Sequence, residues 1–237
     1  MRKYIFLLAL IGIFLSLRLI NLSKFPLYID EGIYINWAKQ FFYDKNLAYI
    51  GLQDGKTPLF MWLTAYFYPF FKNFLLSARV ISVVAASVTI FSWIIIFRSN
   101  KLPKAAVVFW LISLTCPFGF LIERMGFVDS LLTAFSSLSL MTAFLAFQRL
   151  KQDKSWFKII LLAVFNGVIL GLGYMTKTTI IIVIIAEILV YLFWAIELWG
   201  LGKKKQVLKI AFYGLLSFLF YRELVSYLRV GGAKSYF

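Results

Sequence analysis

Two adjacent carboxylates, Asp30 and Glu31, follow the first hydrophobic stretch of the chain. The sequence has 10 acidic residues against 25 basic ones, so a neighbouring pair of acids is notable in it. A carboxylate at a membrane surface can orient or deprotonate an attacking hydroxyl group. Acids at this spacing are also common at a helix start, where they cap free N–H groups and suit the positive end of the helix dipole. From these residues alone, both interpretations stay open.

Three cations, Lys56, Arg124 and Lys177, lie in three separate connections between hydrophobic stretches, and Asp129 follows Arg124 after four intervening residues. A cation just above a bilayer can bind the phosphate of a lipid. Each residue also has an ordinary explanation, because lysines reach to the interface, Arg124 can pair with a neighbouring acid, and Asp129 can cap a helix. Charges in three connections at one membrane level favour a shared site.

The sequence excludes several kinds of catalysis. It contains no histidine and one cysteine, Cys116. Histidine triads, histidine general bases, histidine-ligated zinc and cysteine-pair metal sites are therefore excluded, as is a disulfide within the chain. The chemistry must use carboxylates, lysine, arginine, tyrosine or a metal held by oxygen ligands. No cofactor is assigned, and a divalent cation stays open.

Composition indicates an all-α polytopic membrane protein. The chain of 237 residues is 62% hydrophobic, with mean hydropathy +0.86, and its apolar residues occur in long runs. A spanning helix needs about 20 such residues. The net charge of +15 comes from basic residues that flank the apolar runs, which is typical of cytoplasmic loops and does not indicate a nucleic-acid partner.

About seven spans are expected, at residues 4–19, 75–97, 105–122, 130–147, 159–175, 179–199 and 208–228. The first follows Met-Arg-Lys as a signal peptide would, but it is longer and has no Ala-x-Ala site, which favours an uncleaved span. The first outer loop, 21–76, holds one or two interfacial helices. In the first of them, aromatic residues recur at helical spacing and are expected at headgroup level. The second, 58–71, is short for a span.

Charge decides whether 58–71 crosses the membrane. If it does not, the basic clusters all fall on one side, at Arg2/Lys3, Arg98/Lys101/Lys104, Arg149/Lys151/Lys154/Lys158 and Lys203/Lys204/Lys205/Lys209. The acids of the connections, with Asp30 and Asp129 among them, then fall on the other side. The positive-inside rule favours this arrangement. We therefore expect a cytoplasmic N-terminus and an extracytoplasmic site in the cell (plasma) membrane.

Two polar residues lie near the middle of expected spans, Asn166 in the fifth and Glu187 in the sixth. An intramembrane acid is a candidate functional residue. Antiparallel neighbours would bring the two to similar depth, so a structural hydrogen bond from Asn166 to Glu187 is the favoured interpretation. Gly167 and Gly171 in the same span allow close helix packing.

The motifs occur in a particular order. Asp-Glu lies in the first outer loop, Lys-x-Pro-Leu opens the next helix, Ala-Arg starts a span, Arg-(x)4-Asp lies in the next outer loop, and Leu-Gly-Tyr-Met-Thr-Lys follows. From about residue 5 to residue 200, this order resembles GT-C glycosyltransferases of the protein O-mannosyltransferase and aminoarabinose-transferase type (glycosyltransferase family 39 and its relatives). The chain has Lys-Thr-Pro where the family usually has Lys-Pro-Pro, and Thr-Lys-Thr where it has Thr-Lys-Gly.

The resemblance implies roles for the charged residues. Asp30 matches the acid assigned to the acceptor hydroxyl, with Glu31 beside it. Lys56 matches the lysine that contacts the carrier phosphate. Arg124 and Asp129 match the charged pair of the second outer loop. The catalytic set is then Asp30, Glu31 and Asp129, and the donor-phosphate set is Lys56, Arg124 and Lys177.

The resemblance also implies an activity, the inverting transfer of a sugar from a polyprenyl-phosphate-linked donor to a hydroxyl of a lipid, glycan or protein. Residues 1–237 form one GT-C-like transmembrane domain in this interpretation. Family members are much longer, so the C-terminal part of the family is expected to be missing. Two alternatives remain, a polytopic transporter or flippase and a non-catalytic truncated membrane subunit, although the sequence lacks the internal repeat typical of transporters.

Overall fold

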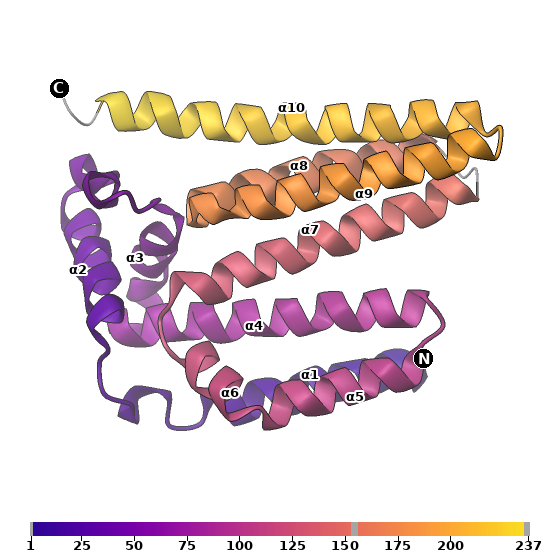
Figure 1. Cartoon of the computed structure of the whole chain (residues 1–237). Helices are drawn as coiled ribbons and strands as arrows, with labels where there is room; N and C mark the ends of the chain where they lie inside the picture. The colour runs from indigo at the N-terminus through magenta and orange to yellow at the C-terminus, as the bar shows by residue number, and fades with distance from the viewer. Residues whose placement is uncertain (1, 153–155, 235–237) are drawn as a thin grey trace.

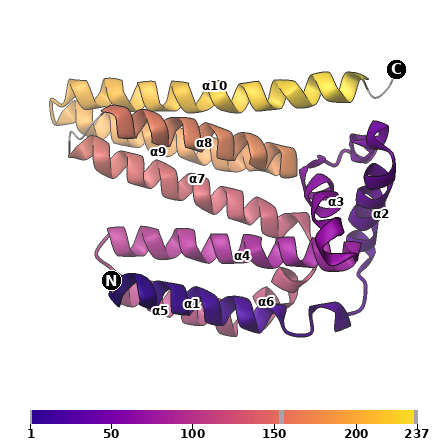
Figure 2. The ribbon, with the colours of Figure 1, turned by 180° about the vertical axis from the view of Figure 1, so that it is seen from behind.

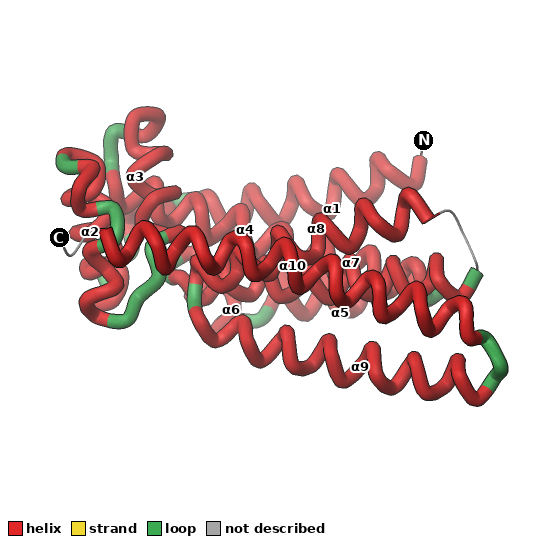
Figure 3. Tube along the Cα trace, turned by 90° about the horizontal axis from the view of Figure 1, so that it is seen from above, coloured by secondary structure: helices red, strands yellow, loops and turns green. Residues whose placement is uncertain are grey.

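The computed structural model describes residues 2–152 and 156–234, and within these ranges every regular element is helical (Figures 1 and 3). Long helices run alongside one another, namely α1 (Arg2–Leu19), α4 (Phe74–Ser99), α5 (Pro103–Thr115), α7 (Val128–Lys151), α8 (Trp156–Thr176), α9 (Ile181–Gly200) and α10 (Lys204–Lys234). Helices α2 (Ile29–Tyr43) and α3 (Leu59–Phe71) lie across one end of this bundle, and the short α6 (Pro117–Arg124) follows α5. Four 3-10 turns connect them, η1 (Leu22–Lys24), η2 (Lys45–Leu47), η3 (Ile50–Asp54) and η4 (Thr178–Ile180).

The predicted class, an all-α polytopic membrane protein, is confirmed. Four helices of the described chain are long and apolar enough to cross a membrane. The number of candidate spans rises to six if each of two bent helix pairs is counted as one span. One of these pairs is α1 with α2, bent by 84°, and the other is α5 with α6, bent by 69°. Helix α10 carries the seventh predicted span and lies beside α8 and α9 (Figure 2), but Arg222 and Glu223 interrupt its apolar run. The short helix predicted at 58–71 is present as α3.

Helix α2 occupies the region predicted to hold an interfacial helix, yet its aromatic face packs against protein. Trp37 is buried, and Phe41 and Phe42 pack in the same cluster with Met61 and Ala65 of α3. Their position at headgroup level stays a prediction, since packing against α3 does not fix the depth of the rings in a bilayer.

The break between α5 and α6 is stabilised by a buried arginine of α1. Pro117 has no N–H, so the carbonyl of Ser113 has no helical donor. Arg18, fully buried, donates from Nη2 to that oxygen at 2.8 Å and from Nη1 to the carbonyl of Leu114 at 3.3 Å. Its Nε lies 2.8 Å from Oε2 of Glu123. Arg18 thus supplies hydrogen-bond donors to carbonyls at the break between α5 and α6.

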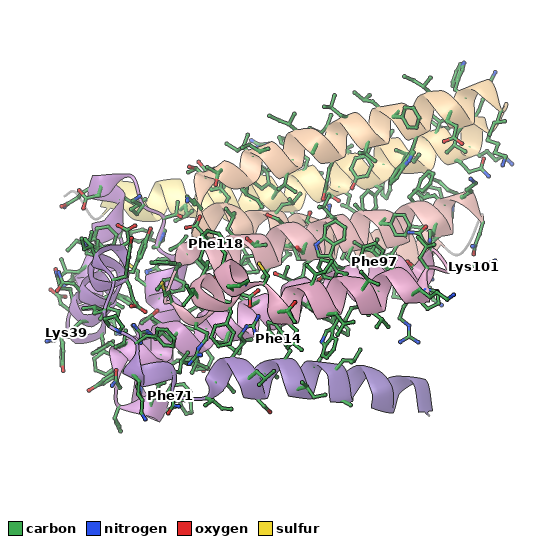
Figure 4. The ribbon with its side chains drawn as sticks, turned by 60° about the horizontal axis from the view of Figure 1, so that its bottom comes forward. Phe14, Lys39, Phe71, Phe97, Lys101 and Phe118 are labelled. Carbon is green, nitrogen blue, oxygen red and sulfur yellow. The ribbon has the colours of Figure 1, made fainter. Side chains whose placement is uncertain are left out.

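The basic clusters between the long helices lie at one end of the bundle. The α4–α5 and α9–α10 turns, which carry basic clusters, lie at the end where the chain begins, and α2 and α3 lie at the other (Figure 1). Lys101 and Lys39 lie at opposite ends in Figure 4. Lys154 lies outside the described residues. The segregation agrees with the non-crossing arrangement predicted from charge.

Inside the bundle, Asn166 donates to Oε2 of Glu187 at 2.9 Å, which confirms the predicted hydrogen bond. Oδ1 of Asn166 accepts from Ser139 and Thr142, each at 2.8 Å, and Tyr191 donates to Glu187 at 3.2 Å. The single hydroxyl proton of Ser139 is shared, because Oε1 of Glu187 also lies within hydrogen-bond distance of that oxygen. The polar groups of this buried cluster thus bond to one another, as a low-dielectric interior requires.

Glycines let α8 and α10 approach closely. A Cβ added to Gly167 would lie 2.7 Å from Cβ of Phe220, and one added to Gly171 would lie 2.7 Å from Cβ of Leu224. Both distances are too short for real side chains. The predicted close packing is therefore present, with α10 as the partner helix.

Candidate functional site

Glu31 lies in the first turn of α2, and its carboxylate is fully buried. Arg79 of α4 binds it with two hydrogen bonds, Nε to Oε1 at 2.7 Å and Nη2 to Oε2 at 2.8 Å. The backbone N–H of Gly126 donates to Oε1 at 2.7 Å, and that of Tyr28 donates to Oε2 at 3.3 Å. Both carboxylate oxygens are engaged, so Glu31 joins α2, α4 and the loop before α7 and is not open to an incoming hydroxyl.

Arg79 also holds the irregular chain between α1 and α2. Its guanidinium donates to the carbonyls of Leu22 at 2.8 Å, Phe25 at 3.0 Å and Pro26 at 3.0 Å. Backbone oxygens outside regular helices need such donors when they are buried. Arg79 was given no role from the sequence. A charged residue near the start of an apolar helix nevertheless indicates that it pairs with a buried partner.

Gly126 is required where the loop before α7 meets this ion pair. An added Cβ would lie 2.8 Å from Cβ of Ala78 and 3.1 Å from Oε1 of Glu31. A side chain there would displace either the helix or the carboxylate. The loop backbone therefore passes against the Glu31–Arg79 pair.

Asp30, next to Glu31, is exposed, and in the described part of the chain its carboxylate accepts no hydrogen bond. Tyr34 lies one turn further along α2. Burial, followed by the negative charges of Asp129 and Asp30, raises the pKa of Tyr34 to about 12. The phenol therefore stays protonated at neutral pH, beside two carboxylates that come from α2 and α7.

A small pocket of about 160 Å³ brings two of the predicted cations together. We call it the two-lysine pocket, and its lining residues are Tyr34, Gly55, Lys56, Thr57, Val128, Thr176, Lys177, Thr178 and Thr179. Lys177 also binds Asp129, with Nζ 2.7 Å from Oδ1. Asp129 lies in the first turn of α7 and does not cap it, because the cap residue is Phe127. Lys56, Lys177 and Asp129 thus belong to one neighbourhood, with Tyr34 linking it to Asp30.

Arg124 lies elsewhere. It is buried at the end of α6 and donates to the carbonyl of Ile20, with its guanidinium over the rings of Phe25 at 4.5 Å and Phe120 at 4.7 Å. It lines a separate hollow of about 480 Å³ that also contains Lys24. The expected ordinary pairing of Arg124 with Glu123 or Asp129 is wrong, because those acids bind Arg18 and Lys177.

An apolar groove of about 230 Å³ lies between α3, α4 and α7. Leu131 in this groove is one helical turn beyond Val128 of the two-lysine pocket, and Leu63 of α3 lies six residues beyond Thr57. The groove and the pocket are therefore lined by residues that lie only one or two helical turns apart along the chain. The structure thus has a cationic pocket at the end of the bundle and a separate apolar groove further along α3, α4 and α7.

A metal-ligating group is not evident at this end. Among the described residues, no three His, Cys, Asp or Glu side chains gather as they would around a metal ion. We therefore derive no step through a divalent cation.

Comparison with known proteins gives one match. A family model described as dolichyl-phosphate-mannose-protein mannosyltransferase matches residues 55–221, which is well over half of the chain. The match begins after Asp30 and Glu31 and includes both lysines of the two-lysine pocket. No curated protein and no solved structure matches the chain.

Proposed function

The chain belongs to the dolichyl-phosphate-mannose-protein mannosyltransferase family and is a membrane glycosyltransferase of the GT-C type, and from this premise we propose that it transfers a sugar from a polyprenyl-phosphate-linked donor to an acceptor hydroxyl. The observation that carries the proposal is the convergence of Lys56 and Lys177 on one pocket, beside the carboxylates that flank Tyr34. The acceptor belongs to a lipid, a glycan or a protein.

The proposed reaction is a single displacement. The acceptor oxygen forms a bond to the anomeric carbon of the sugar while the bond from that carbon to the phosphate oxygen breaks. The electron pair of the broken bond leaves with the polyprenyl phosphate, and the hydroxyl proton passes to Asp30. Attack opposite to the leaving group inverts the anomeric carbon.

Each charged residue has a role in this proposal. Asp30, exposed and without a hydrogen bond in the described chain, orients and deprotonates the hydroxyl. Lys56 and Lys177 stabilise the negative charge that grows on the departing phosphate. Asp129 holds Lys177 through their ion pair. Glu31 acts as a positioning residue that fixes the first turn of α2.

The apolar groove supports a polyprenyl donor. It is lined entirely by apolar side chains of α3, α4 and α7, two helices of which also carry or adjoin residues of the two-lysine pocket. A phosphate in the pocket and an isoprenoid chain in the groove would satisfy the polar and apolar ends of one molecule. We propose that the phosphate binds through Lys56 and Lys177, without Arg124, which lines a different hollow.

The segregation of charge supports a location for the reaction. Because the basic turns lie at the end opposite α2 and α3, the positive-inside rule assigns the site to the extracytoplasmic face and the N-terminus to the cytoplasm. The cell (plasma) membrane is the proposed location of the protein.

The direct test is sugar transfer by the purified chain in lipid nanodiscs, from polyprenyl-phosphate-linked sugars to a panel of lipid, glycan and peptide acceptors. Asp30→Asn should lower turnover about 10²- to 10⁴-fold, as loss of a general base does. Asp44→Asn is the matched control, since Asp44 is also exposed at an end of α2 and asparagine can accept the same hydrogen bond from Asn46. Equal turnover by Asp30→Asn and wild type would remove Asp30 from the mechanism. Donor binding without transfer by the wild type would favour a transport or non-catalytic role.

A further inference from the structure

Thr57 carries a buried hydroxyl without a partner in the wall of the two-lysine pocket. Its Oγ1 makes no hydrogen bond within the described chain. A threonine just before a helix often caps it, but the cap residue of α3 is Pro58, and no side chain caps that helix. A buried hydroxyl that lacks an acceptor destabilises a protein, unless a ligand supplies the acceptor.

A second threonine completes a repeated arrangement. Thr178 follows Lys177 as Thr57 follows Lys56, and the two Lys-Thr pairs, from connections far apart in the sequence, line one pocket. Both lysines of the pocket are therefore followed by a threonine that also lines it.

We propose that Thr57, assisted by Thr178, donates a hydrogen bond to the phosphate of the glycosyl donor. The inference rests on the proposed function and deepens it, because it assigns neutral donors to the phosphate beside the two lysines. Such donors matter here because Asp129 already offsets part of the charge of Lys177. As the bond to the sugar breaks, the phosphate changes from a diester with one negative charge to a monoester with a larger negative charge. Each hydrogen-bond donor therefore binds the phosphate more strongly in the transition state than in the ground state.

The test compares Thr57→Val, which keeps the shape and removes the hydroxyl, with Thr57→Ser, which restores it. Thr57→Val should lower kcat/KM for the donor about 10- to 100-fold, the range for a hydrogen bond to a charged group, and Thr57→Ser should recover most of it. Thr178→Val should have a smaller effect in the same direction, because Thr178 is exposed. Thr115→Val is the control, since Thr115 is exposed at the end of α5.

A binding measurement separates this inference from the proposed function. Polyprenyl monophosphate is the probe, with inorganic phosphate in a second arm to show whether the headgroup alone is bound. Thr57→Val should weaken polyprenyl monophosphate binding by the same 10- to 100-fold and leave the melting temperature without ligand unchanged or raised.

If the wild type transfers no sugar but Thr57→Val still weakens phosphate binding, the proposed function fails and the assignment of Thr57 stands. Unchanged binding and turnover in Thr57→Val, absence of phosphate binding by the wild type, or a lower melting temperature that Thr57→Ser does not restore would each overturn the assignment.

Discussion

Glu31 and Arg79 form a bidentate ion pair with both side chains fully buried, and Nε of Arg79 lies 2.7 Å from Oε1 of Glu31. Because consecutive residues of a helix point about 100° apart around its axis, fixing Glu31 toward α4 leaves Asp30 free to face the outside. The ion pair therefore divides two adjacent, chemically similar acids between different environments. One joins the helices at this end of the bundle, and the other is exposed one turn before Tyr34, which lines the two-lysine pocket.

Glu31→Gln should strongly destabilise the fold. Glutamine keeps the shape but leaves the Arg79 charge buried without a counter-charge, which typically costs about 3–5 kcal/mol. The measurement is thermal unfolding in detergent, with Asp30→Asn as the control, since Asp30 is exposed and should change stability little. Adding Arg79→Met to Glu31→Gln should not restore stability, because it also removes the donors to the carbonyls of Leu22, Phe25 and Pro26. Wild-type stability in Glu31→Gln alone would contradict the structural role of the pair.

Tyr34 should titrate near pH 12. Burial is the larger cause of its raised pKa, followed by the charge of Asp129 and then that of Asp30. Because the folded pKa lies above the usual value of 10.0, this group's contribution to stability is complete below about pH 10 and is lost as the pH rises toward about 12.

The measurement for Tyr34 is the difference in phenolate absorbance between wild type and Tyr34→Phe across the alkaline range. Asp129→Asn should lower the Tyr34 pKa more than Asp30→Asn does. A normal titration near pH 10 would show that Tyr34 is not buried, and an unchanged pKa in Asp129→Asn and Asp30→Asn would show that the two carboxylates do not act on it.

The three candidate phosphate-binding cations should differ in their effects. Lys56→Ala and Lys177→Ala should each weaken use of the donor about 10- to 100-fold, because each removes a charged donor from the pocket. Arg124→Ala should instead lower the melting temperature, since its guanidinium binds the end of α1 and two aromatic rings. Lys101→Ala, at the opposite end of the bundle, is the control. A donor defect in Arg124→Ala at unchanged stability would return Arg124 to the donor site.

The Asn166–Glu187 hydrogen bond should contribute modestly to stability. Glu187→Leu removes the acceptor of the Asn166 amide, although Oδ1 of Asn166 keeps its bonds from Ser139 and Thr142. Bonds of this kind within membranes contribute about 0.6 kcal/mol and up to about 1.7 kcal/mol. Melting curves of Glu187→Leu, Asn166→Leu and the double variant in detergent measure the coupling. A coupling near zero would mean that the two side chains stabilise the bundle independently.

Features that depend on local composition could be predicted from the sequence. Long apolar runs specify membrane helices because the bilayer core leaves backbone groups no partner other than the helix itself. The same reasoning predicted the short α3 and the gathering of the basic turns at the end of the bundle away from it. The Asn166–Glu187 bond was also within reach, since antiparallel helices place residues at matching depths.

The composition of the site depended on tertiary structure. Charges in different connections share a membrane level, but the sequence does not say where around the bundle each one lies, and that position separates Arg124 from Lys56 and Lys177. Arg79 selects which acid of the adjacent pair is buried. The sequence by itself thus determined the class and the position of most long helices, because these follow from hydrophobicity along the chain, but not the break of the predicted span 105–122 between α5 and α6. Only the packing of α2, α3, α4 and α7 decided which charges meet, because lateral contacts depend on how side chains fit between helices.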